Sequence, residues 1–319
     1  MPKAIFLFVL LILTLFSPFI GAIDLSWSTL SQNGSLEQKV FLELRLPRLL
    51  LAFFAGSILA LSGWLFQTLF RNDLMTPYTL GISGGAILGT GIAVVLGLDL
   101  MVLGINTSAL FGFAGALSSV ALILWLARYL NNRGSNALLL LGIALSFFFS
   151  AALMVLFSLA SAMQSHAILH YTMGSLSTMG YTQSIIVALM SFILLLTLYL
   201  KRFELSVMGV NDEHAKLKGI DTKKLTYLLL LVSSLAIGVL ISITGPIGFV
   251  GLIIPHVVRT LYPIANHRLI IPTAIIGGLF LSACDTLSRL PQLQSEVPIG
   301  IVTAFIGGPF FIYLIIKGK

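Results

Sequence analysis

The side chains that could carry out chemistry in this chain lie almost entirely outside its apolar segments. Within them the exception is His256, which follows Pro255, whereas Asp24, Asp99 and Asp285 fall at segment ends. Acids and histidines inside a membrane are costly and usually mark proton- or ion-coupled transport. The chain has no Gly-Lys-Ser or Gly-Lys-Thr phosphate loop and no His-Glu-x-x-His pair. These absences leave a passive channel or a permease driven by a separate ATPase, and they disfavour a membrane enzyme.

Metal, thiol and nucleic-acid chemistry are also disfavoured. Cys284 is the only cysteine, so neither an internal disulfide nor a cysteine metal site can form. Its apolar surroundings favour a small buried side chain over a reactive thiol. The 18 Lys and Arg outnumber the 11 Asp and Glu, but no basic patch with interleaved aromatic residues occurs, which argues against nucleic acid as a partner. We expect no metal and no cofactor on this chain.

The elements that position these side chains are membrane helices. Hydrophobic residues make up 58% of the sequence and charged residues 9%, against roughly 25% charged in soluble domains. About 20 apolar residues cross a bilayer, and Gly245-Pro246 breaks the long run 225–255. We predict an all-α integral membrane protein, one permease-like domain over 1–319 with ten spans. The predicted spans are 4–23, 49–70, 79–98, 103–127, 137–163, 182–200, 225–243, 249–264, 269–284 and 297–316.

The charges predict the orientation of these spans. Ten spans place both termini on one side, and fourteen of the 18 Lys and Arg then fall on that side. Only Lys39, Arg45, Arg48 and Arg289 fall on the other. Cationic residues collect in cytoplasmic loops, so we predict cytoplasmic termini. A cleaved signal peptide is the alternative for the first run, which is long for that role.

Glycine-rich turns suggest two related halves, about 45–163 and 225–319. One turn runs from Gly81 through Gly85 to Gly89, and the other spans 245–251. An odd number of spans separates equivalent segments, so the halves would have inverted topology, as in many transporters. The four-residue spacing of Gly81, Gly85 and Gly89 by itself indicates close helix packing.

The longest polar loop, about 201–224, lies on the predicted cytoplasmic side. Asn211 or Asp212 can cap a short helix there, with Glu213 in its first turn and Gly219 ending it. A short helix in this place could dock a motor protein. The alternative is a solvated loop.

Three arginines on the predicted outer side need an explanation, because positive charge is disfavoured there. Arg45 and Arg48 flank Leu46-Pro47 just before a span, and Arg289 precedes the last span. They could extend to lipid phosphates, or they could form a docking site for acidic groups on a partner.

Motifs along nearly the whole chain resemble the FecCD-type permease family of iron–siderophore, haem and cobalamin ABC importers. The most specific stretch runs from Gly245 to Arg259 and contains Pro246, Gly248, Gly251, Pro255 and His256. The other matching segments are Arg45-Leu46-Pro47-Arg48, Ala60-Leu61-Ser62-Gly63 with Gln67, Leu69-Phe70-Arg71-Asn72, Pro77, Leu80 to Ala86, Met173-Gly174-Ser175-Leu176 and Glu296-Val297-Pro298-Ile299-Gly300.

The resemblance implies a type II ABC importer in a bacterial cytoplasmic (inner) membrane. Two permease subunits, as a homo- or heterodimer, would enclose the pathway, and two cytoplasmic ATP-binding subunits would hold the ATP and magnesium. In such a family the ATPases dock on a coupling segment that matches 209–220 here. A periplasmic or lipoprotein binding protein would deliver the ligand and place its acids against Arg45, Arg48 and Arg289.

The chain also departs from the family pattern. Asp73 stands where proline is usual and Tyr171 stands near a usual tryptophan. The coupling segment of the family usually reads Gly-Glu-x-x-Ala-x-x-Leu-Gly. Here Asp212, Ala215 and Gly219 keep the acid, the alanine and the last glycine, and Lys216 lies between them. Asn211 and Lys218 replace the first glycine and the leucine.

These observations together predict a permease that moves an iron–siderophore complex inward and takes its energy from partner ATPases. Haem or cobalamin is the alternative cargo. A more remote alternative is a secondary transporter that uses His256 for ion coupling, and a membrane scaffold or enzyme is another.

Overall fold

The computed structural model of the chain describes residues 2–20, 35–98, 100–102, 105–127, 135–290 and 296–317. Asp24 and Asp99, two of the acids placed at segment ends, and Gly21-Ala22 lie outside the described residues. Helices account for most of what is described. They are α1 (Pro2–Phe16), η1 (Ser17–Phe19), α3 (Leu36–Lys39), η2 (Val40–Arg45), α4 (Leu46–Phe70), α5 (Ile82–Val95), α6 (Thr107–Ala127), α7 (Ser135–Leu159), α8 (Ala162–Met173), α9 (Thr182–Leu200), α10 (Arg202–Met208), α11 (Asp212–Leu217), α12 (Thr222–Thr244), α13 (Val250–Leu261), η4 (Asn266–Arg268), α14 (Ile270–Ser288) and α15 (Ile299–Lys317).

The predicted fold class, an all-α membrane protein, is confirmed. Six helical segments of the described chain are long and apolar enough to cross a bilayer, and four shorter apolar helices accompany them. Each of the ten predicted runs contains one of these helices. The count of ten membrane crossings stays a prediction, because the four shorter helices do not reach the length of a full span.

Two of the short helices begin in the middle of the bundle. The chain from 71 to 81 is largely non-helical and enters α5 through Gly81, whose φ is +74°. The chain from 245 to 249 enters α13 through Phe249, whose φ is +66°. The predicted spans 79–98 and 249–264 are therefore shorter helices, 82–95 and 250–261, each preceded by a non-helical segment.

Two further details differ from the sequence expectation. A two-residue antiparallel hairpin, β1 (Met101–Val102) and β2 (Ile105–Asn106), precedes α6, so the predicted span 103–127 begins as a helix only at 107. The predicted span 137–163 is divided, because Ser161 caps a new helix. Its hydroxyl accepts the Gln164 backbone N–H, and the Gln164 side chain accepts that of Ser161 in return. Such a reciprocal cap satisfies two otherwise free donors and starts α8.

Helix α4 is the central helix of one group of packed helices. With α3 and η2 it forms one continuous helical segment from 36 to 70, and it packs on α14, α9 and α13. A Cβ at Gly56 would overlap the backbone of Gly277 in α14, and one at Gly63 would overlap that of Gly251 in α13. Small residues at these crossings let the backbones approach closely, which drives helix association in lipid.

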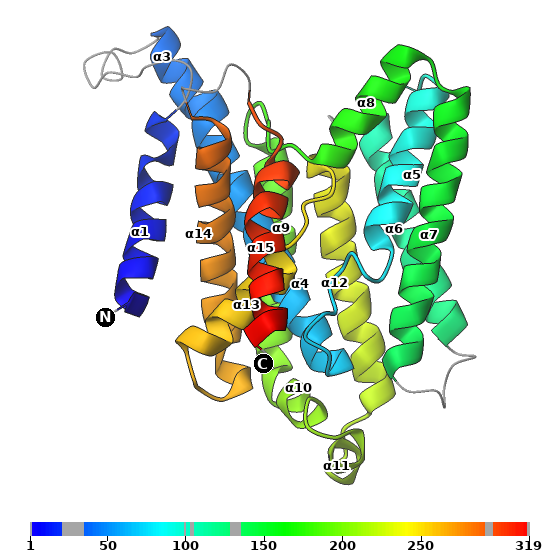
Figure 1. Cartoon of the computed structure of the whole chain (residues 1–319), viewed down its shortest axis with the longest axis vertical. Coiled ribbons are helices and arrows are strands. Elements are labelled where there is room, and N and C mark those ends of the chain that lie inside the picture. Colours follow the sequence, from blue (N-terminus) through cyan, green and yellow to red (C-terminus); the bar gives the residue numbers. More distant parts are fainter. Residues whose placement is uncertain are drawn as a thin grey trace.

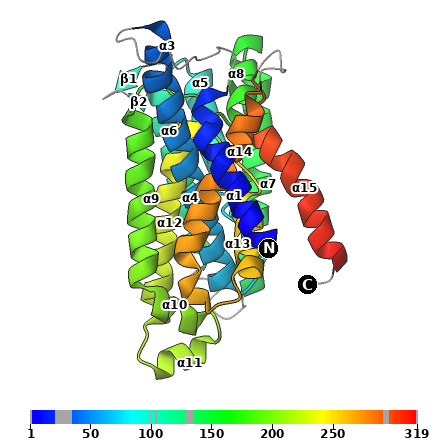
Figure 2. The same ribbon diagram turned by 90° about the vertical axis from the view of Figure 1, so that its left-hand side faces the viewer.

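A second, similar set of contacts joins α12, α5 and α6. Gly85 of α5 and Gly115 of α6 meet backbone to backbone, and α12 packs on α6 as α4 packs on α14. Figure 1 shows α10 and α11 at one end of the bundle and α3 and α8 at the other. Figure 2 shows α15 inclined away from the other helices and α1 lying against α14.

Candidate functional site

A cluster of charged side chains lies at the end of the bundle opposite α11, where α4 begins and α14 ends. Arg48 donates from Nε to Oδ1 of Asp285 at 3.0 Å, and its Nη2 lies 3.0 Å from the same oxygen. Its Nη1 donates to Oε2 of Glu296 at 2.8 Å. The side chain of Asp285 is 1% exposed, whereas that of Glu296 is 59% exposed. Arg48 therefore links a buried acid to an acid at the rim.

Arg289 holds the same acid from the other side. Its Nη2 lies 2.9 Å from Oδ2 of Asp285, a close ion pair without hydrogen-bond alignment. The same nitrogen donates to the hydroxyl of Ser17 at 2.9 Å, and Nη1 donates to the carbonyl of Ile20 at 3.3 Å. Arg45 is buried too and donates to the carbonyl of Pro18 at 2.9 Å. The cluster thus joins α4 and α14 to the segment after α1.

The cluster changes how the three arginines and Asp285 are interpreted. Arg45 and Arg289 are buried by the chain's own groups rather than presented to a partner. Docking by Arg45, Arg48 and Arg289 stays a prediction, and Arg48 with Glu296 is its accessible part. The expectation that acids are not buried needs a correction: Asp285 lies in the last turn of α14 and is fully buried. It is stable there because two guanidinium groups compensate its charge.

The predicted short helix in the loop 201–224 is present as α11. Asn211 is its N-cap and accepts the backbone N–H of Glu213 at 2.8 Å, and Gly219 ends it with φ +77°. Ala215 is buried against its neighbours, whereas Leu217 is 85% exposed. Glu213 and Lys216 are also exposed, and the side chain of Asp212 lies outside what the structure describes. An exposed leucine on a fixed short helix is a surface suited to a partner.

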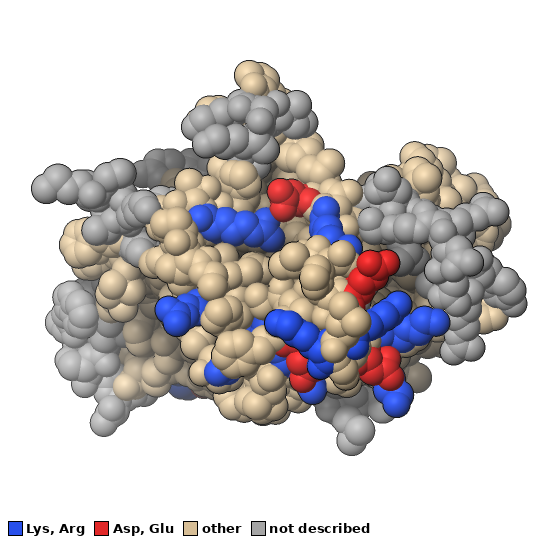
Figure 3. Space-filling view, turned by 90° about the horizontal axis from the view of Figure 1, so that it is seen from below, with Lys and Arg blue, Asp and Glu red and all other residues tan. Residues whose placement is uncertain are grey.

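Helix α10 fixes this segment to the core. Arg71 ends α4 in a left-handed conformation, φ +49°, and its Nη2 donates to the carbonyl of Met208 at 2.7 Å. Nearby, Arg259 of α13 pairs with Asp73 at 2.8 Å, so the acid that replaces the usual proline has a partner. Figure 3 shows this end of the molecule, where Lys and Arg side chains are spread over the surface with fewer acids among them.

An uncharged groove of about 700 Å³ lies between α5, α7 and α8 on one side and α15 on the other. Its lining carries hydroxyl, thioether and apolar groups. The residues are Tyr78, Ser83, Gly84, Ile87, Ser146, Ser150, Thr172, Met173, Pro246, Gly248, Gly300, Ile301, Ala304 and Phe305. The hydroxyls of Tyr78 and Ser83 are buried and lie near each other in this wall. They add polar groups without charge to the groove.

The glycines of the 245–251 motif shape the wall of this groove. Gly245 has φ +68° and a Cβ there would overlap the carbonyl of Tyr171. A Cβ at Gly174 would lie 2.7 Å from the carbonyl of Pro246, and the backbone N–H of Ser175 donates to the carbonyl of Thr244 at 2.7 Å. The end of α8 and the break after α12 therefore form one close-packed unit that only glycine permits. Pro255 lies buried within α13.

His256 is half-buried in α13 and its ring lies 6.1 Å from that of Phe310, centroid to centroid. Within the described residues there is no cluster of three or more His, Cys, Asp or Glu that could hold a metal. Cys284 is buried, as its surroundings predicted.

Sequence reasoning missed several contacts of this site. Asp285 was placed at a segment end without a partner, and Glu296 appeared only as part of a motif. Both lie far from Arg48 in sequence, and the signal available was that three arginines occupied a side of the membrane where positive charge is disfavoured. Arg71 appeared only as a cytoplasmic charge and as part of a motif, and its contact with Met208 has no sequence signature.

Comparison with known proteins places the chain in a family. The model of the FecCD transport family matches residues 9–317. The hemin transport system permease protein HmuU of Yersinia pestis is 35% identical over 98% of this chain and 94% of its own length. The molybdate import system permease protein MolB of Haemophilus influenzae is 33% identical over 95% of this chain and 88% of its own.

The fold also matches a solved structure. A metal-chelate type ABC transporter in an inward-facing conformation superposes with a TM-score of 0.86 and 29% identity, covering 99% of this chain and all of that one. The motif stretch 245–259, the helical core and the family match agree with one another. This chain is a member of the FecCD transport family, the group of ABC importer permeases that its motifs resemble.

Proposed function

We propose that the chain is the membrane-spanning permease subunit of an importer that moves an iron–siderophore complex across a bacterial cytoplasmic membrane. Membership of the FecCD transport family supports the permease role. The hemin permease and the metal-chelate transporter among its similar proteins support an iron chelate, whereas the molybdate permease shows that similar chains serve other cargo. Haem and cobalamin are the alternative cargoes.

The uncharged groove carries this proposal. Its walls offer hydroxyls, a thioether and apolar groups but no charge, which suits a bulky ligand that must pass without being held. Phe305 of α15 is 82% exposed beside the groove, so this face is not closed by the chain itself. We propose that a second permease subunit, identical or related, faces it and that the two grooves together form the pathway.

Energy would come from two cytoplasmic ATP-binding subunits, which would hold ATP and magnesium. The coupling segment would be α10 and α11, with Asn211, Asp212, Glu213, Ala215, Lys216 and Gly219 at its centre. Its contact with α4 through Arg71 and Met208 gives a mechanical route into the bundle. Both termini would be cytoplasmic, consistent with the basic surface at the α11 end.

A periplasmic or lipoprotein binding protein would dock at the other end, at the cluster of Arg45, Arg48 and Arg289, of which Arg48 with Glu296 is the accessible part. The proposed inverted halves, about 45–163 and 225–319, agree with the paired contacts α4 with α14 and α12 with α6. They also agree with the non-helical segments that precede α5 and α13, one in each half.

The test is reconstitution in vesicles with the ATPase and the binding protein, followed by uptake of labelled ferric siderophore. We expect uptake that requires ATP and the binding protein. A groove variant, Ser83→Phe, is compared with a control variant, Ser118→Phe, because Ser118 is an exposed residue of α6 away from the groove. Only the groove variant should reduce uptake. Accumulation by this chain without an ATPase, or equal uptake by both variants, would contradict the proposal.

A further inference from the structure

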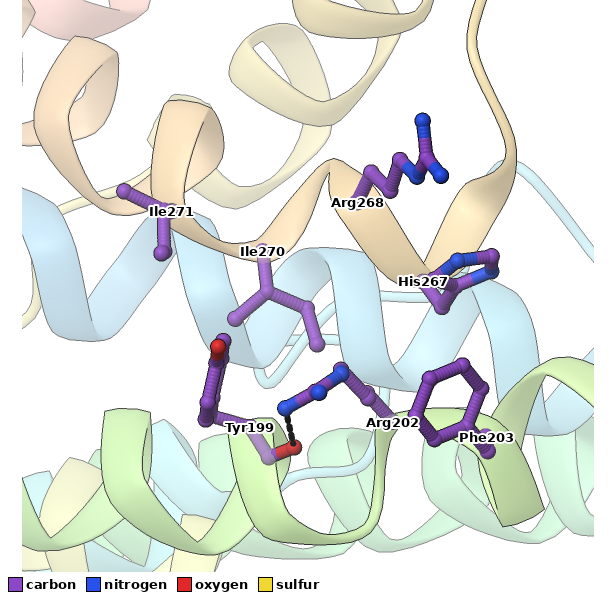
Figure 4. A pocket seen from close by; sticks show the side chains of 7 residues that line it. All are labelled: Tyr199, Arg202, Phe203, His267, Arg268, Ile270 and Ile271. Atoms are coloured by element: carbon purple, nitrogen blue, oxygen red, sulfur yellow. Dashed lines mark hydrogen bonds between the residues drawn. The ribbon is translucent and has the colours of Figure 1, made fainter.

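A second pocket lies at the α11 end of the bundle, away from the groove. It has a volume of about 400 Å³ and is formed where α9 passes into α10 and where η4 passes into α14. Figure 4 shows the side chains of α9 and α10 on one side of it and those of η4 and α14 on the other, with the guanidinium of Arg268 turned away from Arg202. The lining residues are Tyr199, Arg202, Phe203, His267, Arg268, Ile270 and Ile271.

The pocket is cationic and aromatic. The guanidinium carbon of Arg202 lies 3.9 Å from the ring centroid of Tyr199 and 4.7 Å from that of Phe203. Its Nη1 donates to the carbonyl of Tyr199 at 3.0 Å, so its other N–H groups remain for a ligand. The ring of His267 lies 5.1 Å from that of Phe203, and Arg268 is exposed at the mouth, with a long side chain that can rotate toward it.

No acid neutralises these cations within the described part of the chain. None of the residues that line the pocket is acidic. Glu204, the nearest acid in sequence to Arg202, pairs with Lys201 at 2.9 Å on the other side of the turn. An anion would therefore find two arginines and a histidine without a competing carboxylate.

The pocket is held in place by the core. The indole Nε1 of Trp64 donates to Oδ1 of Asn266 at 3.0 Å, and Nδ2 of Asn266 lies 3.4 Å from the hydroxyl of Thr68. Both partners belong to α4, so they fix η4 and with it His267 and Arg268. The arrangement is thus held by part-buried hydrogen bonds to the core helix α4.

The position of the pocket selects the kind of anion. The apolar stretch of α9 ends at Leu200, and that of α14 begins at Ile270, so the pocket lies where hydrocarbon meets water. Leu196 lies one helical turn from Tyr199, and Ile275 lies one turn from Ile271, in each case toward the apolar middle of the helix and on the same face. Both side chains are exposed. Acyl chains could lie on these side chains while a headgroup phosphate meets the arginines.

We propose that this pocket binds the headgroup of an anionic phospholipid. Basic pockets between membrane helices at the cytoplasmic level bind such headgroups, and guanidinium groups suit phosphate because they can donate two parallel hydrogen bonds. The proposal is independent of the cargo, since it concerns lipid on the outer surface of the bundle and not the groove.

The test is native mass spectrometry of the purified full chain in detergent, with phosphatidylglycerol and phosphatidylcholine of the same acyl chains. We expect preferential binding of phosphatidylglycerol, reduced about fivefold by Arg202→Gln and about fivefold by Arg268→Gln. Arg202→Lys should keep most of the preference. Lys224→Gln is the matched control, because this exposed cation at the same end of the molecule lies outside the pocket, and it should change nothing.

Three results would overturn the proposal. Equal binding of the two lipids would remove the charge preference, and a preference that persists in the Arg202→Gln, Arg268→Gln double variant would place the lipid elsewhere. Displacement of the lipid by millimolar inorganic phosphate would assign the pocket to a free anion. A melting profile of each variant checks that the chain is still folded, and failure of transport has no bearing on any of these outcomes.

Discussion

Replacing Asp285 by Asn is the sharpest test of the charge cluster at the end of the bundle opposite α11. In the wild-type chain Asp285 lies between Arg48 and Arg289, with closest separations of 3.0 and 2.9 Å. The substitution keeps the shape of the side chain but removes its charge, so Arg289, with a side chain only 5% exposed, loses its ion pair. Leaving a buried charge without its partner costs about 3–5 kcal/mol.

That loss should be visible as a fall in thermal stability. At about 2–4 °C per kcal/mol for a chain of this size class, Asp285→Asn should lower the midpoint of thermal unfolding by about 10 °C. The assay is heating of the detergent-purified protein followed by size-exclusion chromatography with fluorescence detection. Glu296→Gln is the matched control. It removes the other acid on Arg48, but Glu296 is largely exposed, and an exposed pair contributes about 0–1 kcal/mol.

A double-mutant cycle then measures the interaction energy between Asp285 and Arg289 apart from the effect of each single substitution. Arg289→Gln with Asp285→Asn should cost less than the sum of the single variants, because the second change removes the cation that the first left unpaired. Equal midpoints for Asp285→Asn and Glu296→Gln, or additive losses in the cycle, would refute the assignment of a buried ion pair.

Three further predictions concern the packing and the predicted cytoplasmic end. Gly63→Val should destabilise the chain by about 1–3 kcal/mol or more, measured by the same melting assay, because any Cβ there overlaps the backbone of Gly251. Asp73→Asn breaks the pair with Arg259, yet it should shift stability by no more than about 1 kcal/mol, because the acid is exposed; a larger loss would show that the pair holds the two halves together. Leu217→Asp should leave the melting midpoint unchanged but reduce co-purification with the ATPase and ATP-driven uptake, and full retention of both would remove α11 as the coupling helix.

The sequence predicted the fold class because composition and run length decide it directly. With 9% charged residues the chain cannot cover itself in water, and every apolar run contains a helix. The breaks before α5 and α13 also follow from the sequence, because 71–73 carry charge and Gly245-Pro246 interrupts the second run. The helix ends were less accessible: α5 begins only at Ile82, and Ser161 divides the predicted span 137–163. Contacts at these places, such as that of Gly142 with the backbone of Thr79, join residues that are distant in sequence.

In the candidate site, too, features set by neighbouring residues were predictable, whereas contacts between residues distant in sequence were not. Asn211 and Gly219 act within a few residues of their own positions, so the cap and the end of α11 follow from local rules. Arg48 acts on Asp285, 237 residues away, and position along the chain does not reveal such a partner. The sequence therefore singled out the arginines correctly as unusual but could not distinguish an inward ion pair from an outward docking group.

Helix α4 connects the two ends of the proposed mechanism. Its first turn holds Arg48, the link to the buried acid and the outer rim, and its last residue precedes Arg71, which holds α10 at the other end. Between them, Gly56 and Gly63 allow the backbone of α4 to contact the backbones of α14 and α13 directly. Close backbone contact leaves little room for α4 to bend independently, since packed interiors shift between discrete arrangements rather than deforming continuously. In the proposed mechanism, a movement of α10 and α11 by a motor would therefore reach the charge cluster at the opposite end through α4 as a displacement of packed helices, without any charge having to move through the membrane.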